Sequence, residues 1–129
     1  MSKLLIVTTA LAMGASLVFF QNCGQIPSAK ISDKDLSALY QKIEKTTSAS
    51  CTQDSECKQI SVGNKPCGGP WGYIVYSKDT TDEENLILLV KEVFKLETQL
   101  NLQANDTSIC DFSMPYESLH CESDICSGS

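Results

Sequence analysis

The sequence predicts a small α+β domain that is cross-linked by disulfide bonds, with a short antiparallel sheet packed on one long helix. Seven cysteines in 129 residues are a dense set, and none forms a Cys-x-x-Cys pair, so their spacing favours disulfides in an oxidising compartment over zinc. The strongest helical periodicity covers residues 82–102. Short segments typical of strands lie on both sides of it, and this order predicts α+β architecture.

Residues 1–22 have the pattern of a bacterial export signal. Lys3 supplies the positive charge, and an uncharged, largely apolar run follows over residues 4–20. Cys23 comes next, where the lipid-modified cysteine of bacterial lipoproteins would lie. The preceding Phe20, Gln21 and Asn22 depart from the usual lipoprotein cleavage box. The alternative is therefore an uncleaved membrane anchor with an unmodified Cys23.

The cysteine count favours the lipoprotein interpretation. Setting Cys23 aside leaves an even set that three disulfides can use completely: Cys51, Cys57, Cys67, Cys110, Cys121 and Cys126. The sequence cannot select among the many pairings. We favour bonds that join the first strand region to the C-terminal hairpin, and a bond from Cys67 to Cys110 that would tie a glycine-rich loop to the chain after the long helix.

Residues 23–50 are expected to form a lipidated tether followed by an amphipathic helix over residues 33–45. Ser32 and Asp35 have the spacing of a capping box at its start. The cysteine-rich domain then covers residues 51–129. It opens with a polar turn that Asp54 would close through its own backbone, and alternating apolar residues predict strands over 58–62 and 73–77.

The long helix should begin at a second capping box, Thr81 with Glu84, and its acidic first turn suits the helix dipole better than a metal site. After it, residues 108–112 are expected to begin another strand. Residues 119–126 are expected to form a small hairpin about a Glu-Ser-Asp turn.

Charge and motifs exclude several functions. The chain has ten lysines, no arginine and sixteen acidic residues, with a net charge of −6, which argues against nucleic-acid and phosphate ligands. No catalytic, metal-binding or cofactor-binding motif is present. His120 is the only histidine, and its neighbour Cys121 would point to the opposite face of a strand. We therefore expect no enzyme, no metal and no cofactor.

The candidate interaction site is the loop over residues 63–76. A loop held by Cys67 could present aromatic side chains of the types common at interface hot spots, and its expected contact residues are Pro66, Gly68, Gly69, Trp71, Tyr73 and Tyr76. The alternative is that Trp71 covers the core while the glycines only allow the chain to turn.

The motif Lys-Pro-Cys-Gly-Gly-Pro-x-x-Tyr at residues 65–73, within the cysteine pattern of residues 51–126, resembles a set of small cysteine-rich bacterial proteins of secreted or lipoprotein type. The resemblance implies export and disulfides but supplies no activity. The expected protein is a cell-envelope lipoprotein, anchored by lipid in the outer membrane on its periplasmic or surface face. Its domain would bind a protein or an envelope polymer. The alternative is a structural envelope protein without a discrete ligand, and a secreted inhibitor or an enzyme is less favoured.

Overall fold

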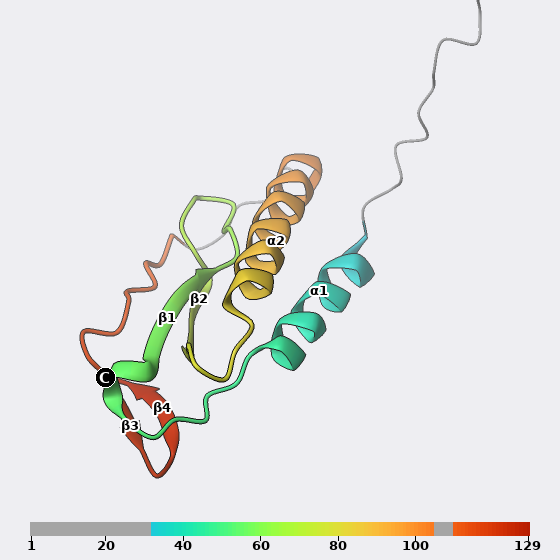
Figure 1. Ribbon diagram of the computed structural model, residues 1–129. Helices are drawn as coiled ribbons and strands as arrows, with labels where there is room; N and C mark the ends of the chain where they lie inside the picture. The colour runs from blue at the N-terminus through green and yellow to red at the C-terminus, as the bar shows by residue number, and fades with distance from the viewer. Residues whose placement is uncertain (1–31, 105–109) are drawn as a thin grey trace, which may run out of the picture.

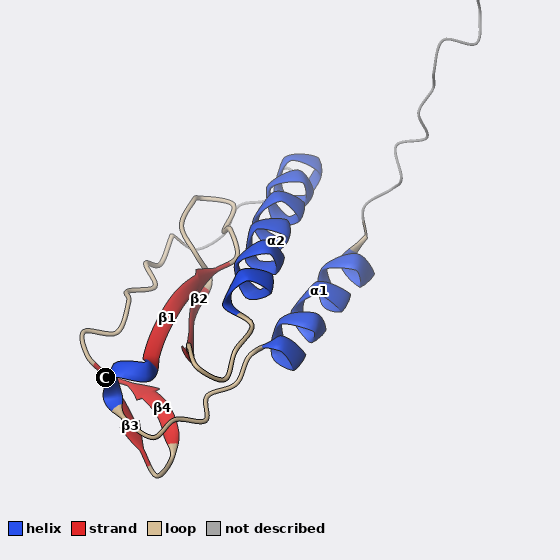
Figure 2. Cartoon of the chain, in the orientation of Figure 1, coloured by secondary structure: helices blue, strands red, loops and turns tan. Residues whose placement is uncertain are grey.

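The computed structural model describes residues 32–104 and 110–129 (Figure 1). The predicted export signal, Cys23 and the tether lie outside these residues. The described chain is a small α+β structure with one long helix, short antiparallel strand pairs and two disulfide bonds (Figure 2). Its elements follow the order α1, η1, β1, β2, α2, β3, β4.

Helix α1 covers Asp33–Thr46, one residue longer than the predicted range. The backbone N–H of Ser32 donates to Asp35 Oδ2 at 3.0 Å, which satisfies a donor at the helix start. At the other end, the N–H of Thr47 donates to the carbonyl oxygen of Ile43 at 2.9 Å. Leu39 and Ile43 are its buried residues, so the apolar stripe read from the sequence is the face that packs.

Strands β1 (Cys57–Val62) and β2 (Gly72–Ser77) form an antiparallel hairpin. Cys57 lies opposite Ser77 at one end, and Val62 lies opposite Gly72 at the other. A short 3-10 turn, η1 (Asp54–Glu56), precedes β1. The hairpin connection is the glycine-rich segment 63–71, which we call the glycine loop.

Helix α2 covers Glu83–Ala104. The side chain that caps it is Asp82, whose Oδ1 accepts the N–H of Asn85 at 3.2 Å. The prediction of Thr81 as the cap is wrong, because the Thr81 side chain is buried and bonds the backbone of Ser48 instead. Thr81 thus holds the chain that leaves α1, and the next residue, Asp82, caps α2 instead.

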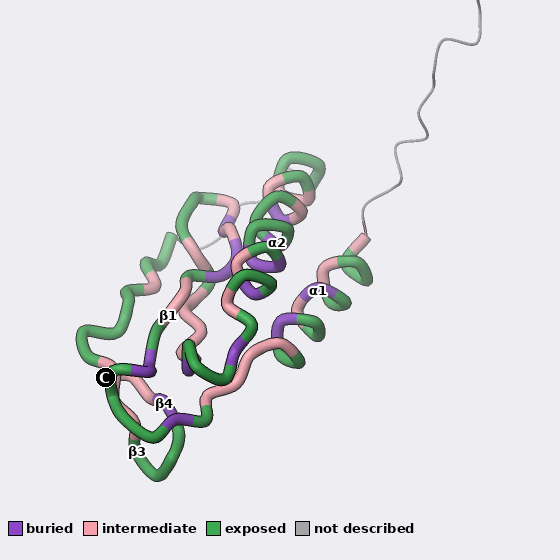
Figure 3. Tube along the Cα trace, in the orientation of Figure 1, coloured by how far each residue is buried: buried purple, intermediate pink, exposed green. Residues whose placement is uncertain are grey.

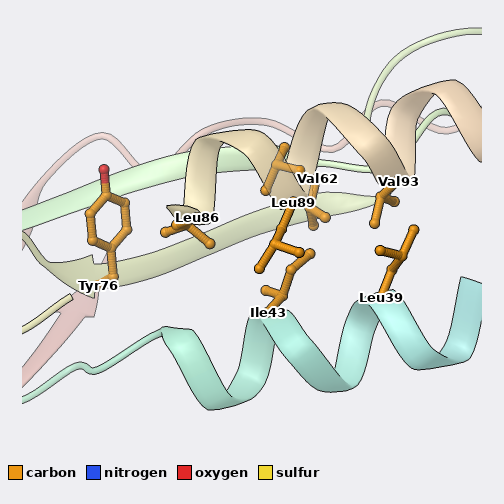
Figure 4. Close-up of a cluster of buried hydrophobic side chains, with 8 residues drawn as sticks. Leu39, Ile43, Val62, Tyr76, Leu86, Leu89 and Val93 are labelled. Carbon is orange, nitrogen blue, oxygen red and sulfur yellow. The ribbon is translucent and has the colours of Figure 1, made fainter. Parts of the chain in front are cut away.

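The core lies between α1, α2 and one face of the first hairpin (Figure 4). Leu86 and Val93 of α2 are fully buried. The remaining members of the cluster come from all of these elements: Leu39, Ile43, Val62, Tyr76, Leu89 and Val90. Burial of such side chains contributes about 1.5–3 kcal/mol each, so this cluster is the main stabilising contact between the helices and the hairpin.

Strands β3 (Leu119–Glu122) and β4 (Ile125–Gly128) form a second hairpin. Its two-residue turn places Ser123 and Asp124 at positive φ, 52° and 63°, as a type I′ turn requires. The disulfide Cys57–Cys126 joins this hairpin to the start of β1, and Cys51–Cys121 joins it to the segment before η1. Their sulfurs lie in a second buried cluster. In a chain with so small an apolar core, these disulfides supply stability that a larger domain gains from apolar packing.

Two local expectations are corrected by the structure. Residues 110–112 are irregular and do not begin a strand. Further along, the side-chain amide of Gln59 bonds the backbone of Tyr116, accepting from its N–H and donating to its carbonyl, each at 2.9 Å. The Asp54 carboxylate does not close its own turn, because its Oδ1 accepts the N–H of Cys121 at 2.8 Å.

Candidate binding surface at the glycine loop

The glycine loop is a folded turn whose backbone groups bond one another. The N–H of Gly68 donates to the carbonyl of Lys65 at 2.8 Å, and the N–H of Lys65 donates to the carbonyl of Gly69 at 2.9 Å. Gly68 and Gly69 have φ of 94° and 84°, which only glycine adopts without strain. Pro66 follows Lys65 in this turn, where its restricted φ is suitable. The loop therefore has one defined shape.

Helix α2 holds the first half of the loop. The N–H of Asn64 donates to the carboxylate of Glu97. The side-chain amide of Asn64 donates to Thr98 Oγ1 at 2.9 Å, and that of Asn101 donates to the carbonyl of Asn64 at 2.8 Å. Three residues within about one turn of the helix thus form hydrogen bonds with a single loop residue, and these bonds fix the start of the loop to the helix.

Glu97 also connects the loop to α1. Its side chain is buried, and Oε1 accepts the phenol of Tyr40 at 2.9 Å. Burial is the main reason that the pKa of Tyr40 is raised, and the hydrogen bond to Glu97 adds to it. The carboxylate therefore joins both helices and the loop through neutral donors.

Lys65 holds the other side of the loop. This lysine is buried, and its Nζ donates to the carbonyl of Asp111 at 2.5 Å and to Ser113 Oγ at 3.3 Å. The same Nζ lies 5.6 Å from the centroid of the Trp71 ring, within the range of a cation–π interaction. Lys65 thereby joins the loop to the segment that follows α2, and this segment runs beside β1 in Figure 1.

Trp71 lies at the end of the loop with half of its surface exposed, 50%. The Ser113 hydroxyl donates to the Trp71 carbonyl at 2.8 Å. One edge of the ring covers Gly63, where an added Cβ would come within 2.3 Å of Trp71 Cδ1. The ring thus contacts Gly63 along one edge and lies over the Lys65 ammonium, and half of the residue remains exposed.

Two more large apolar residues are exposed in the segment that Ser113 joins to the Trp71 carbonyl. Phe112 and Met114 are 81% and 76% exposed, and they flank Ser113, whose side chain turns towards the loop. The segment that carries them is largely exposed in Figure 3. We call Trp71, Phe112 and Met114 the aromatic surface.

The predicted loop residues differ in how exposed they are. Gly68 and Gly69 are exposed, whereas Pro66 and Tyr73 are partly buried. The expectation that Tyr76 is an exposed contact residue is wrong, because Tyr76 is buried in the core, where its phenol donates to Glu83 at 2.7 Å. Burial, with this hydrogen bond, raises the pKa of Tyr76 to about 12. Tyr76 therefore packs in the core rather than on the exposed surface of the loop.

Lys65, Phe112 and Met114 are site residues that the sequence does not predict. Phe112 and Met114 lie in an irregular segment without periodicity, so the sequence contains no signal that they are exposed. Lys65 stands within the Lys-Pro-Cys-Gly-Gly-Pro motif, but a surface lysine and a buried one look the same in sequence.

The cysteine sulfurs of the second core cluster are not a metal site. The Sγ atoms of Cys51, Cys57 and Cys126 lie within 4.8 Å of one another, but each is in a disulfide, and metal ligation requires a thiolate. His120 lies on β3 opposite Ser127, and its neighbour Cys121 is bonded to Cys51. The two disulfides therefore account for the close approach of these sulfurs.

Comparison of the chain with protein-family models, with curated proteins and with solved structures found no match. Among residues 32–104 and 110–129, no helix has the length and apolar character needed to cross a membrane.

Proposed function

We propose that the domain is a protein-binding module of the bacterial cell envelope and that the aromatic surface is its contact site. The observation that carries this proposal is the half-exposed Trp71 at the end of a loop whose Asn64 is bonded to α2 and whose Lys65 is bonded to the segment after α2. Aromatic side chains and methionine are enriched at protein interfaces, where a few of them contribute most of the binding free energy.

The loop is suited to this role because its backbone is already held in one conformation before a partner binds. A contact residue that is already held loses less conformational entropy when a partner arrives. Gly63, Lys65 and Ser113 each constrain Trp71 or its backbone. The partner that fits is a protein surface with an apolar centre. Basic residues at its edge would suit the net charge of −6.

Site-specific photo-crosslinking tests the proposal in intact cells. A photoreactive residue in place of Phe112 should give a discrete cross-linked product, and the change Trp71→Ala in the same chain should reduce its yield at least several-fold. Leu88 is the matched control position, because it is an exposed apolar residue, 59% exposed, on helix α2, which carries no residue of the aromatic surface. A structural protein without a discrete partner would give no specific product, or the same products from both positions.

We propose further that Cys23 carries the lipid that holds this module at the membrane. Support comes from the position of Cys23 shortly after the apolar run and from the even number of cysteines that remains. The disulfides indicate an oxidising compartment, as an exported domain would require. The intact mass of the membrane-extracted protein should show a chain that begins at Cys23 with diacylglycerol attached. A mass that still includes residues 1–22 would contradict lipoprotein processing.

A further inference from the structure

Cys67 and Cys110 are brought together by one lysine. Cys67 lies within the Lys65–Gly68 turn, which the hydrogen bond from the Gly68 N–H to the Lys65 carbonyl closes at 2.8 Å. Cys110 directly precedes Asp111, whose carbonyl accepts from Lys65 Nζ at 2.5 Å. The backbone on both sides of the pair is thus anchored to Lys65. Both cysteines are exposed.

The two side chains interact directly. The Cys110 thiol is hydrogen-bonded with the Cys67 side chain, and this bond is the main reason that the pKa of Cys110 is raised. The Lys65 ammonium acts in the opposite direction on the same thiol. The hydrogen bond places the two sulfurs within direct reach of each other, as the formation of a disulfide between them requires.

We propose that Cys67 and Cys110 are a reversible disulfide site that exchanges with small disulfides of the oxidised-glutathione class. The Cys67 thiolate attacks one sulfur of the small disulfide, breaks its S–S bond and releases one thiolate. Cys110 then gives its proton to solvent, and its sulfur attacks Cys67, which releases the second small thiol. Two protein thiols are oxidised and one small disulfide is reduced to two thiols. Excess small thiol reverses both steps.

Burial distinguishes this pair from the two structural disulfides. Cys51, Cys57 and Cys126 are buried in the second core cluster, where a small thiol has poor access. Exposed disulfides are the ones that exchange readily. The pair also lies at the junction that Lys65 makes, so its disulfide would join the glycine loop covalently to the segment that bears Phe112 and Met114. This inference goes beyond the proposed binding function and does not depend on it.

The test is a redox titration of the full-length protein, extracted in detergent and equilibrated with a series of ratios of reduced to oxidised glutathione. Accessible thiols are blocked with N-ethylmaleimide under native conditions, and peptide mass spectrometry measures each cysteine separately. Cys67 and Cys110 should lose reactivity together, at one midpoint, and a peptide cross-linked between them should appear. Cys57 and Cys126 should remain unreactive throughout the series and serve as the internal control.

Two single variants identify the chemistry. In Cys67→Ser the reactivity of Cys110 should persist to more oxidising ratios. In Cys110→Ser the mixed disulfide of glutathione on Cys67 should accumulate, because the second attack is removed. Independent midpoints for the two cysteines, a cross-link from either of them to another cysteine, or reactivity that no ratio abolishes would overturn the proposal. So would a Cys67–Cys110 bond that resists reduction as strongly as Cys57–Cys126.

Discussion

The phenol of Tyr40 on α1 donates to the carboxylate of Glu97 on α2, with 2.9 Å between Tyr40 Oη and Glu97 Oε1. The other carboxylate oxygen accepts the N–H of Asn64 at the base of the glycine loop. A buried carboxylate needs such donors to replace water. This contact makes the position of the loop depend on the packing of both helices, and it suggests where substitutions should have their largest effects.

Glu97→Gln should lower the free energy of unfolding by about 1–3 kcal/mol. The amide keeps one acceptor oxygen, but its NH2 group then faces a backbone or phenol donor. Urea unfolding at neutral pH measures the loss. Glu92→Gln is the matched control, because Glu92 is exposed on the same helix, and a change within about 0.5 kcal/mol is expected there. Equal effects of the two substitutions would show that the Glu97 contacts do not stabilise the fold.

Gly63→Ala should displace Trp71. A Cβ at this position would come within 2.3 Å of Trp71 Cδ1 and 2.9 Å of Glu97 Oε2, on a residue with φ of 85°. Gly69→Ala is the control, since Gly69 has φ of 84° but no atom within 4 Å of a Cβ. Both variants carry a strain of order 1–2 kcal/mol from the positive φ. Only Gly63→Ala should also shift the fluorescence emission of Trp71, the sole tryptophan, and identical spectra would contradict the contact.

The protein should lose stability between pH 10 and pH 12. The pKa of Tyr76 rises from 10.0 to about 12 on folding, so the folded state favours the protonated phenol. That stabilisation is complete below the unfolded pKa and is lost as the pH rises through the folded one. Tyr40 adds an effect of the same sign, because burial raises its pKa as well.

Rapid chemical unfolding at a series of pH values measures this loss. The Tyr76→Phe variant, which has no phenol to ionise, should decline less steeply than the parent over this interval. Tyr116→Phe makes the same substitution at an exposed residue outside the core and is the control. A parent stability that is constant up to pH 12 would show that these phenols titrate alike in the folded and unfolded chains.

Of the two structural disulfides, Cys51–Cys121 should be reduced first. Cys121 is partly exposed, whereas Cys57 and Cys126 are both buried, and a reductant needs access to a sulfur atom. Graded dithiothreitol followed by alkylation and peptide mass spectrometry gives the order. Reduction of Cys57–Cys126 first, or of both bonds at one concentration through global unfolding, would contradict local access as the controlling factor.

Several features could be predicted from local sequence. The apolar stripe of α2 has a period that only a helix presents on one face, and Ser32 with Asp35 marked the start of α1. The alternation about Ile60 and Val62 indicated β1. The number and spacing of cysteines indicated disulfides, and two of the three that were expected are present among the described residues. The expected Cys67–Cys110 bond is instead a hydrogen-bonded pair of side chains. Each of these signals is carried by residues near one another in the chain.

The remaining features depend on contacts between distant segments. Thr81 lost its capping role to a bond with Ser48, and Asp54 turned to Cys121, 67 residues away. Tyr73 and Tyr76 looked alike as loop aromatics, yet only Tyr76 became core. A polar or aromatic side chain can satisfy several partners, and which one it meets is decided when the segments pack.

The composition and periodicity of this chain were thus sufficient for its class, its helices and its reliance on disulfides, because those follow from local backbone preference and apolar spacing. The tertiary structure alone decided that Cys57 pairs with Cys126, that Lys65 is buried beneath Trp71, and that Phe112 and Met114 remain exposed. Those outcomes depend on which surfaces the packing of α1, α2 and the hairpins left uncovered, and no local pattern encodes that.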